Sequence, residues 1–285
     1  MNNRKTFWLG IVAAAALAAT GCGDDNGDNN GGSGGTAGSG GEAGAGGEAG
    51  AGGMPAGMAM VRVAHLGTNL PTAANTLVDV TVDGTVAIED LAFEMSTGFI
   101  PLPEGEYTFG VNIADTDTEV FSATAMLPAD SITTVVAIAS VNIEEEPEDV
   151  TPLNALIFNG DLTDLDLGSG RVLVGHGFDE EPFAVVDVIL PATCDDDGAL
   201  VPDLAFPTVE TVGDLPEGDY VIALAAPDSC EAAVGPLTAP VTPDVATLLI
   251  AAADAEGNPQ VYALIGDFAS GEQMEPIPTL PAAAE

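Results

Sequence analysis

The sequence predicts an all-β protein that contains two tandem β-sandwiches. Three observations support this prediction. The 285 residues include 35 glycines and 20 prolines, which indicates many turns. Short runs rich in β-branched residues alternate with turn residues, and no stretch longer than a turn or two shows helical periodicity. Many short strands separated by turns are typical of a β-sandwich.

The sequence after position 59 contains an internal repeat, which divides it into two domains. Five landmarks recur in the same order: VRVAHLG (61–67) with VLVGHGF (172–178), LVDVTVDG (77–84) with VVDVILPA (185–192), LPEGEYTFGVNIAD (102–115) with LPEGDYVIALAAPD (215–228), DSITTVVAIA (130–139) with DVATLLIAAA (244–253), and ALIFNGD (155–161) with ALIGD (263–267). Their spacing is nearly constant. We therefore expect one β-sandwich over residues 60–168 and a second over residues 169–270.

Each landmark predicts a local structure. The first is an alternating strand that ends at a histidine, His65 or His176. The second, in repeat 1, is a strand–turn–strand with Asp83-Gly84 at the turn, a strong hairpin signal. The third bends at its proline and glycine and then continues as an alternating strand that begins with Tyr107 or Tyr220. We expect these histidines and tyrosines to be structural residues in equivalent places.

The segments at the two ends differ from the repeats. Residues 22–59 are dominated by glycine, alanine and small polar residues, which predicts a disordered, Gly-rich tether. Residues 271–285 are acidic and are interrupted by prolines; with Ser270 they read SGEQMEPIPTLPAAAE. We expect them to form a disordered tail.

The first 21 residues predict a signal peptide. Arg4 and Lys5 precede an apolar run, residues 7–19, which is shorter than the roughly 20 residues that a membrane span needs. The small residues directly before Cys22 resemble the lipobox of bacterial lipoproteins, although Ala19 stands where a leucine is usual. The alternative is an ordinary secretory signal that leaves Cys22 unmodified. Both predict export, and we expect a lipidated Cys22 at the outer membrane or at the periplasmic face of the inner membrane.

The charge of the chain restricts its partners. There are 45 acidic residues against 4 lysines and arginines, a formal net charge of −41. Such a protein repels phosphate backbones, so we expect no nucleic-acid partner. Loose association with divalent cations is compatible with this charge.

Three motifs of the repeats resemble those of the bacterial domain of unknown function 4397. They are VRVAH (61–65), VDVTVDG (78–84) and LPEGEY (102–107). In the second repeat the Asp-Gly turn is replaced by Leu190-Pro191, and Arg171 stands five residues before its histidine instead of three. The resemblance covers about 210 residues, and it implies Ig-like β-domains of envelope or extracellular proteins. It supplies no catalytic residue.

The two other cysteines, Cys194 and Cys230, lie in polar loops of the second repeat. Two such cysteines in an exported protein predict a disulfide, with free thiols or a metal pair as the alternatives. A bridge that closes about 37 residues stabilises a fold by roughly 3–4 kcal/mol in the chain-entropy estimate. Repeat 1 has no cysteine, so we expect a local reinforcement of repeat 2.

Catalytic or metal-binding motifs are absent from the sequence. The chain has two histidines, one per repeat, whereas a hydrolase needs a base beside a nucleophile at one centre. The acidic runs 143–149, 178–182 and 194–198 could bind Ca²⁺, but none has EF-hand spacing. We expect hydrogen-bonded structural histidines, solvated loop charge, no resident metal and no cofactor.

These observations predict a non-catalytic, lipid-anchored envelope protein whose β-sandwiches form a binding or structural module. A protein or a carbohydrate surface is the expected kind of partner. Two alternatives remain open: an envelope hydrolase, and Ca²⁺-dependent adhesion or assembly.

Overall fold

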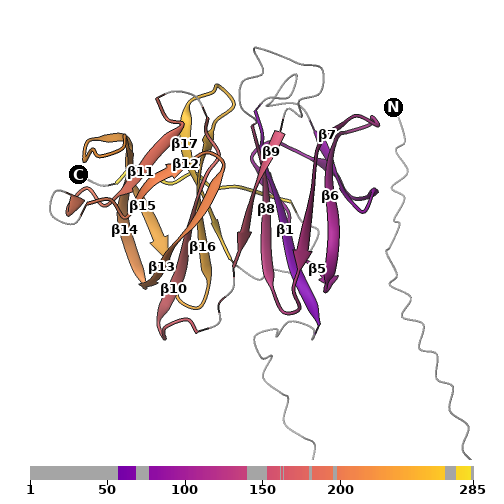
Figure 1. The fold of residues 1–285 in the computed structure, drawn as a ribbon, viewed down its shortest axis with the longest axis horizontal. Coiled ribbons are helices and arrows are strands. Elements are labelled where there is room, and N and C mark those ends of the chain that lie inside the picture. The colour runs from indigo at the N-terminus through magenta and orange to yellow at the C-terminus, as the bar shows by residue number, and fades with distance from the viewer. Residues whose placement is uncertain are drawn as a thin grey trace, which may run out of the picture. The chain divides into compact units, whose positions relative to one another are not determined.

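A computed structural model describes residues 57–68, 77–139, 153–160, 162, 164–179, 182–194, 198–266 and 274–283 (Figure 1). All of them belong to one compact unit, residues 51–285. The predicted signal peptide (1–21), Cys22 and nearly all of the predicted tether (22–59) lie outside the described residues. No helix within the described ranges has the length and apolar character needed to cross a membrane.

Every element that the described residues form is a β-strand. In the first half these are β1 (Met58–Leu66), β2 (Val78–Val82), β3 (Thr85–Leu91), β4 (Met95–Ser96), β5 (Ile100–Pro103), β6 (Gly105–Ile113), β7 (Glu119–Leu127), β8 (Ile132–Ala139) and β9 (Leu153–Asn159). The second half contains β10 (Ser169–His176), β11 (Val185–Ile189), β12 (Val201–Ala205), β13 (Thr208–Pro216), β14 (Gly218–Ala225), β15 (Ala232–Val241), β16 (Ala246–Ala253) and β17 (Pro259–Ile265), and it is followed by β18 (Glu275–Pro276).

The strands of each half form two sheets that face each other across a hydrophobic core. In the first sandwich, the sheet β18-β4-β1-β8-β9, to which β5 adds through β1, faces the sheet β3-β2-β6-β7. In the second sandwich, the sheet β13-β10-β16-β17 faces the sheet β12-β11-β14-β15. The predicted all-β, sandwich-type architecture is therefore confirmed.

The two halves repeat the same strand pairings. β1 runs parallel to β8, and β10 runs parallel to β16. The order β3-β2-β6-β7 has its counterpart in β12-β11-β14-β15. Aspartates with positive φ recur at three equivalent turns: Asp90 and Asp203, Asp115 and Asp228, and Asp130 and Asp244. Aspartate tolerates this left-handed backbone conformation better than most residues do.

A third core joins the two halves. β1, β8, β10 and β16 are buried almost throughout, since one face of each strand lies in its own sandwich and the other faces the opposite half. Leu66 and Phe158 of the first half share this interface core with Leu173, Leu248 and Ile250 of the second. Packing is closest at Gly175, where an added Cβ would lie 2.4 Å from Cζ of Phe158. A glycine there allows the two inner sheets to approach each other.

The C-terminal segment, defined here as residues 274–283, corrects the prediction of a disordered tail over 271–285. Its strand β18 pairs with β4, Leu280 N donates to Val261 O (2.9 Å), and Thr238 N donates to Pro281 O (2.9 Å). The segment therefore adds to the edges of three sheets.

The segment also contributes an apolar side chain to each of three cores. Ile277 is buried in the interface core and Leu280 in the core of the second sandwich, while Met274 packs against the core of the first. Its prolines are compatible with this arrangement because proline is tolerated in an extended edge segment. The order of the segment comes from distant strands, which its own sequence does not reveal.

Candidate functional site

The first predicted site residue, His65, lies at the end of β1 and is fully buried in the first sandwich. Its Nδ1 accepts a hydrogen bond from Gly67 N at 3.3 Å, and its ring contacts Phe93 edge-on. Nε2 is buried without a hydrogen-bond partner. Burial lowers the pKa of His65 to about 4, because desolvation penalises the charged imidazolium. The ring is therefore neutral at neutral pH.

His176 occupies the equivalent place at the end of β10, 1% exposed. Its Nε2 donates to the carbonyl oxygen of Phe183 at 2.6 Å, and Nδ1 has no hydrogen-bond partner. Burial lowers the pKa of His176, and the hydrogen bond to Phe183 partly opposes that effect. Each histidine thus contacts main-chain groups of its own sandwich, and the structure does not bring the two together.

Tyr107 and Tyr220 make identical contacts in the two halves. The hydroxyl of Tyr107 donates to Pro103 O at 3.0 Å, and the hydroxyl of Tyr220 donates to Pro216 O at 3.0 Å. Each tyrosine fastens the bend that precedes its strand to the strand itself. A hydroxyl that reaches back to the main chain a few residues upstream also occurs in Ig-type sandwiches.

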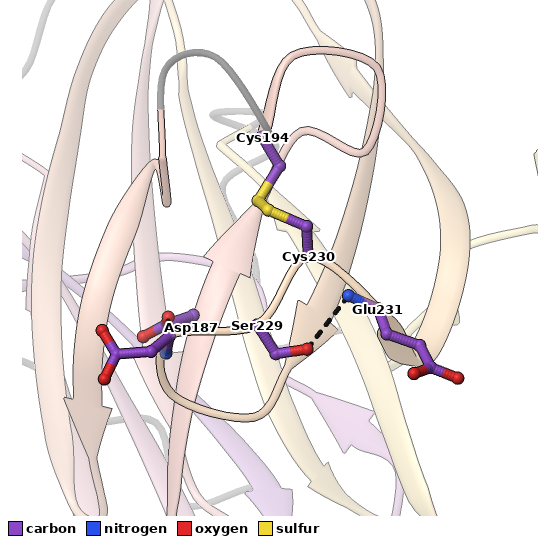
Figure 2. The surroundings of a disulfide bond; sticks show 6 residues. Asp187, Cys194, Ser229, Cys230 and Glu231 are labelled. Carbon is purple, nitrogen blue, oxygen red and sulfur yellow. Dashed lines mark hydrogen bonds between the residues drawn. A yellow bond between two sulfur atoms is a disulfide. The ribbon is translucent and has the colours of Figure 1, made fainter.

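The predicted disulfide between Cys194 and Cys230 is confirmed, with the two Cα atoms 5.7 Å apart (Figure 2). It joins the loop after β11 to the loop after β14. Near it, Ser229 Oγ accepts a hydrogen bond from Glu231 N at 3.1 Å. Cys194 is buried among apolar residues, including Ile189 and Ala223. The bridge fastens one end of the outer sheet of the second sandwich.

Asp187, also shown in Figure 2, is a buried carboxylate that the sequence analysis did not single out. Its Oδ1 accepts from Asp203 N at 2.8 Å and its Oδ2 from Asp228 N at 2.9 Å. Both donors belong to residues with positive φ, so Asp187 holds two turns in place. Its equivalent, Asp79, accepts from Asp90 N at 2.9 Å. The signal was present in the sequence, since the VDV motif carries an aspartate between two core valines in both repeats.

Arg62 is a second residue that sequence reasoning passed over as a site. It is 6% exposed and lies at the interface between the halves, where Nη1 donates to Ile265 O at 3.2 Å. Nε donates to Thr134 Oγ1 at 3.3 Å, and the guanidinium lies 4.7 Å from the ring centroid of Phe99. Burial lowers the pKa of Arg62 to about 10. Arg62 thus contributes main-chain, hydroxyl and aromatic contacts to the junction of the halves.

A second polar contact crosses the same interface. The hydroxyl of Tyr262 donates to Glu94 Oε1 at 2.8 Å, and burial together with Glu94 raises the pKa of this tyrosine. Ile277 N of the C-terminal segment donates to the carbonyl oxygen of Glu94 at 2.8 Å. The interface is therefore fixed by oriented polar contacts as well as by apolar packing.

The remaining predicted sites are only partly visible. The run 143–149 lies outside the described residues, as do parts of 178–182 and 194–198. Among the residues that the structure does describe, no three His, Cys, Asp or Glu side chains are grouped so that they could hold a metal ion. An apolar cavity of about 40 Å³ lies between the sheets of the second sandwich, lined by Val174, Leu215 and Ile222 among others.

Arg171 forms an ion pair with Asp214 at the edge of the second sandwich. Nε and Nη2 of Arg171 donate to the two carboxylate oxygens at 2.8 and 3.0 Å. This pairing holds the pKa of Asp214 below its usual value. Arg62 and Arg171, the two arginines of the sandwiches, are therefore both engaged within the fold.

Comparison with known proteins relates the first half to a family. No curated protein is significantly similar to the chain. Residues 59–185, which extend from β1 to the first residue of β11, match the family described as "Domain of unknown function (DUF4397)". The match to this domain family covers one continuous stretch of the chain, and no function is assigned to the family.

Proposed function

We propose that the protein is a non-catalytic, lipid-anchored protein of the bacterial cell envelope, and that its two β-sandwiches form a binding or structural module. The observation that carries this proposal is the placement of the two histidines. Each is buried in its own core with main-chain groups as hydrogen-bond partners. General-base catalysis needs a histidine within hydrogen-bond reach of a nucleophile or substrate. Both histidines instead stabilise the ends of equivalent strands.

We further propose that the second half is a diverged copy of the domain that the first half contains. The support is a set of equivalent contacts that sequence similarity alone does not require. Tyr107 and Tyr220 donate to prolines four residues upstream. Asp79 and Asp187 each accept from the amide of an aspartate with positive φ. The strand orders of the two sandwiches correspond as well.

The envelope location is supported by two features of the chain. The disulfide between Cys194 and Cys230 is of a kind that persists in oxidising compartments. The N-terminal sequence has the charged residues, apolar run and small residues that precede the cysteine of a lipoprotein. In this proposal Cys22 is free for lipidation, because the other two cysteines bond to each other.

Intact-mass analysis of the mature protein, isolated from bacterial membranes, tests the anchor. We expect Cys22 at the N-terminus with the added mass of a lipid, and we expect the Cys22→Ala variant to be released in soluble form. Cleavage at another position, or an unmodified Cys22, would overturn the lipid anchor.

Screening the full Cys22→Ala chain on a glycan array and against envelope extracts tests the binding function. We expect a saturable ligand that is recovered chemically unchanged. A ligand that is hydrolysed by the wild type, and no longer hydrolysed by His65→Gln or His176→Gln, would establish an enzyme instead. The same screen with a chelator present tests whether Ca²⁺ is needed.

A further inference from the structure

The strand β7 forms one edge of the outer sheet of the first sandwich, next to β6. The orientation of its backbone follows from Thr108 on β6. Thr108 N donates to Asp83 Oδ1, and Thr108 O accepts from Asp83 N, so both of these backbone groups face β2. Thr108 stands opposite Thr124 in the antiparallel pair. Because the backbone groups of Thr108 face β2, Thr108 and Thr124 form a non-hydrogen-bonded pair. In such a pair the backbone groups of both residues point away from each other. The amide and carbonyl of Thr124 therefore face the side of β7 that lies away from β6.

The same direction holds for residues two positions away on β7, because backbone orientation alternates along a strand. Ser122, Thr124 and Met126 therefore all present amide and carbonyl groups to the open side. These three residues are exposed, and no described segment bonds to their outward backbone groups. β7 is nine residues long and contains no proline. An edge of this kind is a template for the addition of another strand.

The second sandwich shows how this edge accepts a strand. Tyr107 stands opposite Ala125, and its equivalent Tyr220 stands opposite Ala239, so Thr124 corresponds to Thr238. Thr238 N donates to Pro281 O at 2.9 Å, and Ala283 N donates to Pro236 O at 3.0 Å. The C-terminal segment thus occupies on β15 the outward groups that are open on β7.

Sequence differences between the two edges agree with this contrast. Proline stands at positions 236 and 240 of β15, and the equivalent residues of β7 are Ser122 and Met126. Each proline removes an outward amide and limits further pairing. β7 retains every one of these donors. Within the described residues, the fold therefore covers one of two equivalent edges and leaves the other unpaired.

The charge of the molecule identifies the kind of partner. Arg62 is buried, and Arg171 is paired with Asp214, so neither offers a free positive charge at the surface of the sandwiches. Exposed Glu106 and Glu119 lie on β6 and β7 beside the open edge. A second copy of the chain would bring a further formal charge of −41. A basic segment would be attracted and a second copy repelled.

We propose that the outer edge of β7 docks an extended, basic segment of another protein as an additional strand. This inference rests on the proposed binding function and gives that function a surface and a class of partner. Main-chain hydrogen bonds to Ser122, Thr124 and Met126 would supply the pairing, and lysine or arginine side chains would face the carboxylates near the edge.

Titration of the full Cys22→Ala chain with two peptides tests the proposal. The probe is an eight-residue peptide of alternating valine and threonine with a lysine at each end, and its control carries glutamate at both ends. Two further variants test whether the backbone amide of residue 126 contributes to peptide binding. Met126→Pro removes an outward amide at a place where the second sandwich already carries Pro240, whereas Met126→Thr keeps it.

We expect the lysine peptide to bind the Cys22→Ala chain and its Met126→Thr derivative, and to bind the Met126→Pro derivative at least tenfold more weakly. The glutamate peptide should also bind at least tenfold more weakly. In amide hydrogen exchange, Thr124 and Met126 of the Cys22→Ala chain should become protected when the lysine peptide is added. Hydrogen exchange on the Cys22→Ala chain locates the bound peptide without the Met126→Pro variant, so the test remains valid even if that variant does not fold.

Three results would overturn the inference: no binding of the lysine peptide, equal binding to Met126→Pro, or protection confined to other strands. Failure here is distinguishable from failure of the binding function. The glycan and extract screens could yield a ligand that binds the Met126→Pro derivative as tightly as the parent chain. That result would support the binding function and would exclude only the β7 edge as its site.

Discussion

The two sandwiches have corresponding strand orders but differ in their cross-links and in how far their sheet edges are covered. The second has a disulfide between Cys194 and Cys230, an ion pair between Arg171 and Asp214, and the C-terminal segment along two of its edges. The equivalent places in the first sandwich have no cysteine, and no segment among the described residues pairs with the outer edge of β7. The position equivalent to Arg62, which the first sandwich buries at the interface, is Leu173 in the second.

This difference indicates a division of roles within one repeated fold. The features added to the second sandwich all restrict motion or cover backbone groups. Most of the family match falls on the first sandwich, and no described segment pairs with the outer edge of its strand β7. We infer that the second sandwich stabilises the pair, and that the first is better suited to meet a partner. The following predictions test that contrast.

The largest expected effect comes from removing the anchors of the C-terminal segment. Ile277 and Leu280 are 5% and 7% exposed. Replacing both with alanine should lower the free energy of unfolding by about 4 kcal/mol, near the lower limit for two buried aliphatic side chains. Urea denaturation measures this loss. Thr279→Ala, at an exposed position between them, is the control and should change stability by less than about 0.5 kcal/mol.

Loss of the disulfide should come next. The double variant Cys194→Ser, Cys230→Ser should be less stable by about 3 kcal/mol, because the unfolded chain regains the freedom that the bridge removes. Thermal melting of the variant and of the reduced wild type should give the same midpoint. Equal stability with and without the bridge would contradict the idea that the second sandwich is the reinforced one.

Acidification should destabilise the protein through its buried histidines. Folding lowers the pKa of His65 from the ordinary histidine value of 6.5 to about 4, so between these pH values the unfolded state binds more protons. Stability should therefore decrease as the pH falls, by about 2 kcal/mol between pH 7 and pH 5 for His65 alone. Denaturation at both pH values measures the change. His65→Gln should reduce the pH dependence and leave the part that His176 contributes.

The smallest effect compares the two equivalent aspartates. Asp187 accepts from two backbone amides and Asp79 from one. Asp187→Ala should therefore cost more stability than Asp79→Ala, by about 1–2 kcal/mol for the additional charge-assisted hydrogen bond. Urea midpoints of the two variants, with Asp219→Ala at an exposed position as the control, decide the comparison. Equal losses would mean that the turn at Asp228 does not depend on Asp187.

Much of each sandwich was predictable because its signals are local. Alternating runs such as 107–113 predict strands, and the Asp83-Gly84 pair predicts the turn between β2 and β3, which the structure confirms. The pairing of Cys194 with Cys230 followed from their shared repeat and the expected export. The histidines were expected to be hydrogen-bonded structural residues, and each does make a main-chain hydrogen bond.

The interface and the C-terminal segment were not predicted, because they depend on contacts between distant residues. One signal for the interface was available: the continuous apolar runs 135–139 and 248–253 indicate strands that are buried on both faces. The segment offered no comparable signal. Its prolines suggested disorder, whereas its stability depends on edges that belong to β4, β17 and β15.

The contact between Ile277 and Glu94 has a consequence for the way the chain is made. These residues are far apart in sequence, and the edges of the second sandwich are covered by residues 274–283, which are synthesised after β1 to β17. A ribosome that has produced the first 270 residues has supplied strands β1 to β17 but not the segment that adds to their edges. Closure of the fold therefore waits for synthesis of the C-terminal segment. A chain cut short after residue 273 would leave the edges of β4, β15 and β17 without this segment and would be a ready substrate for proteases.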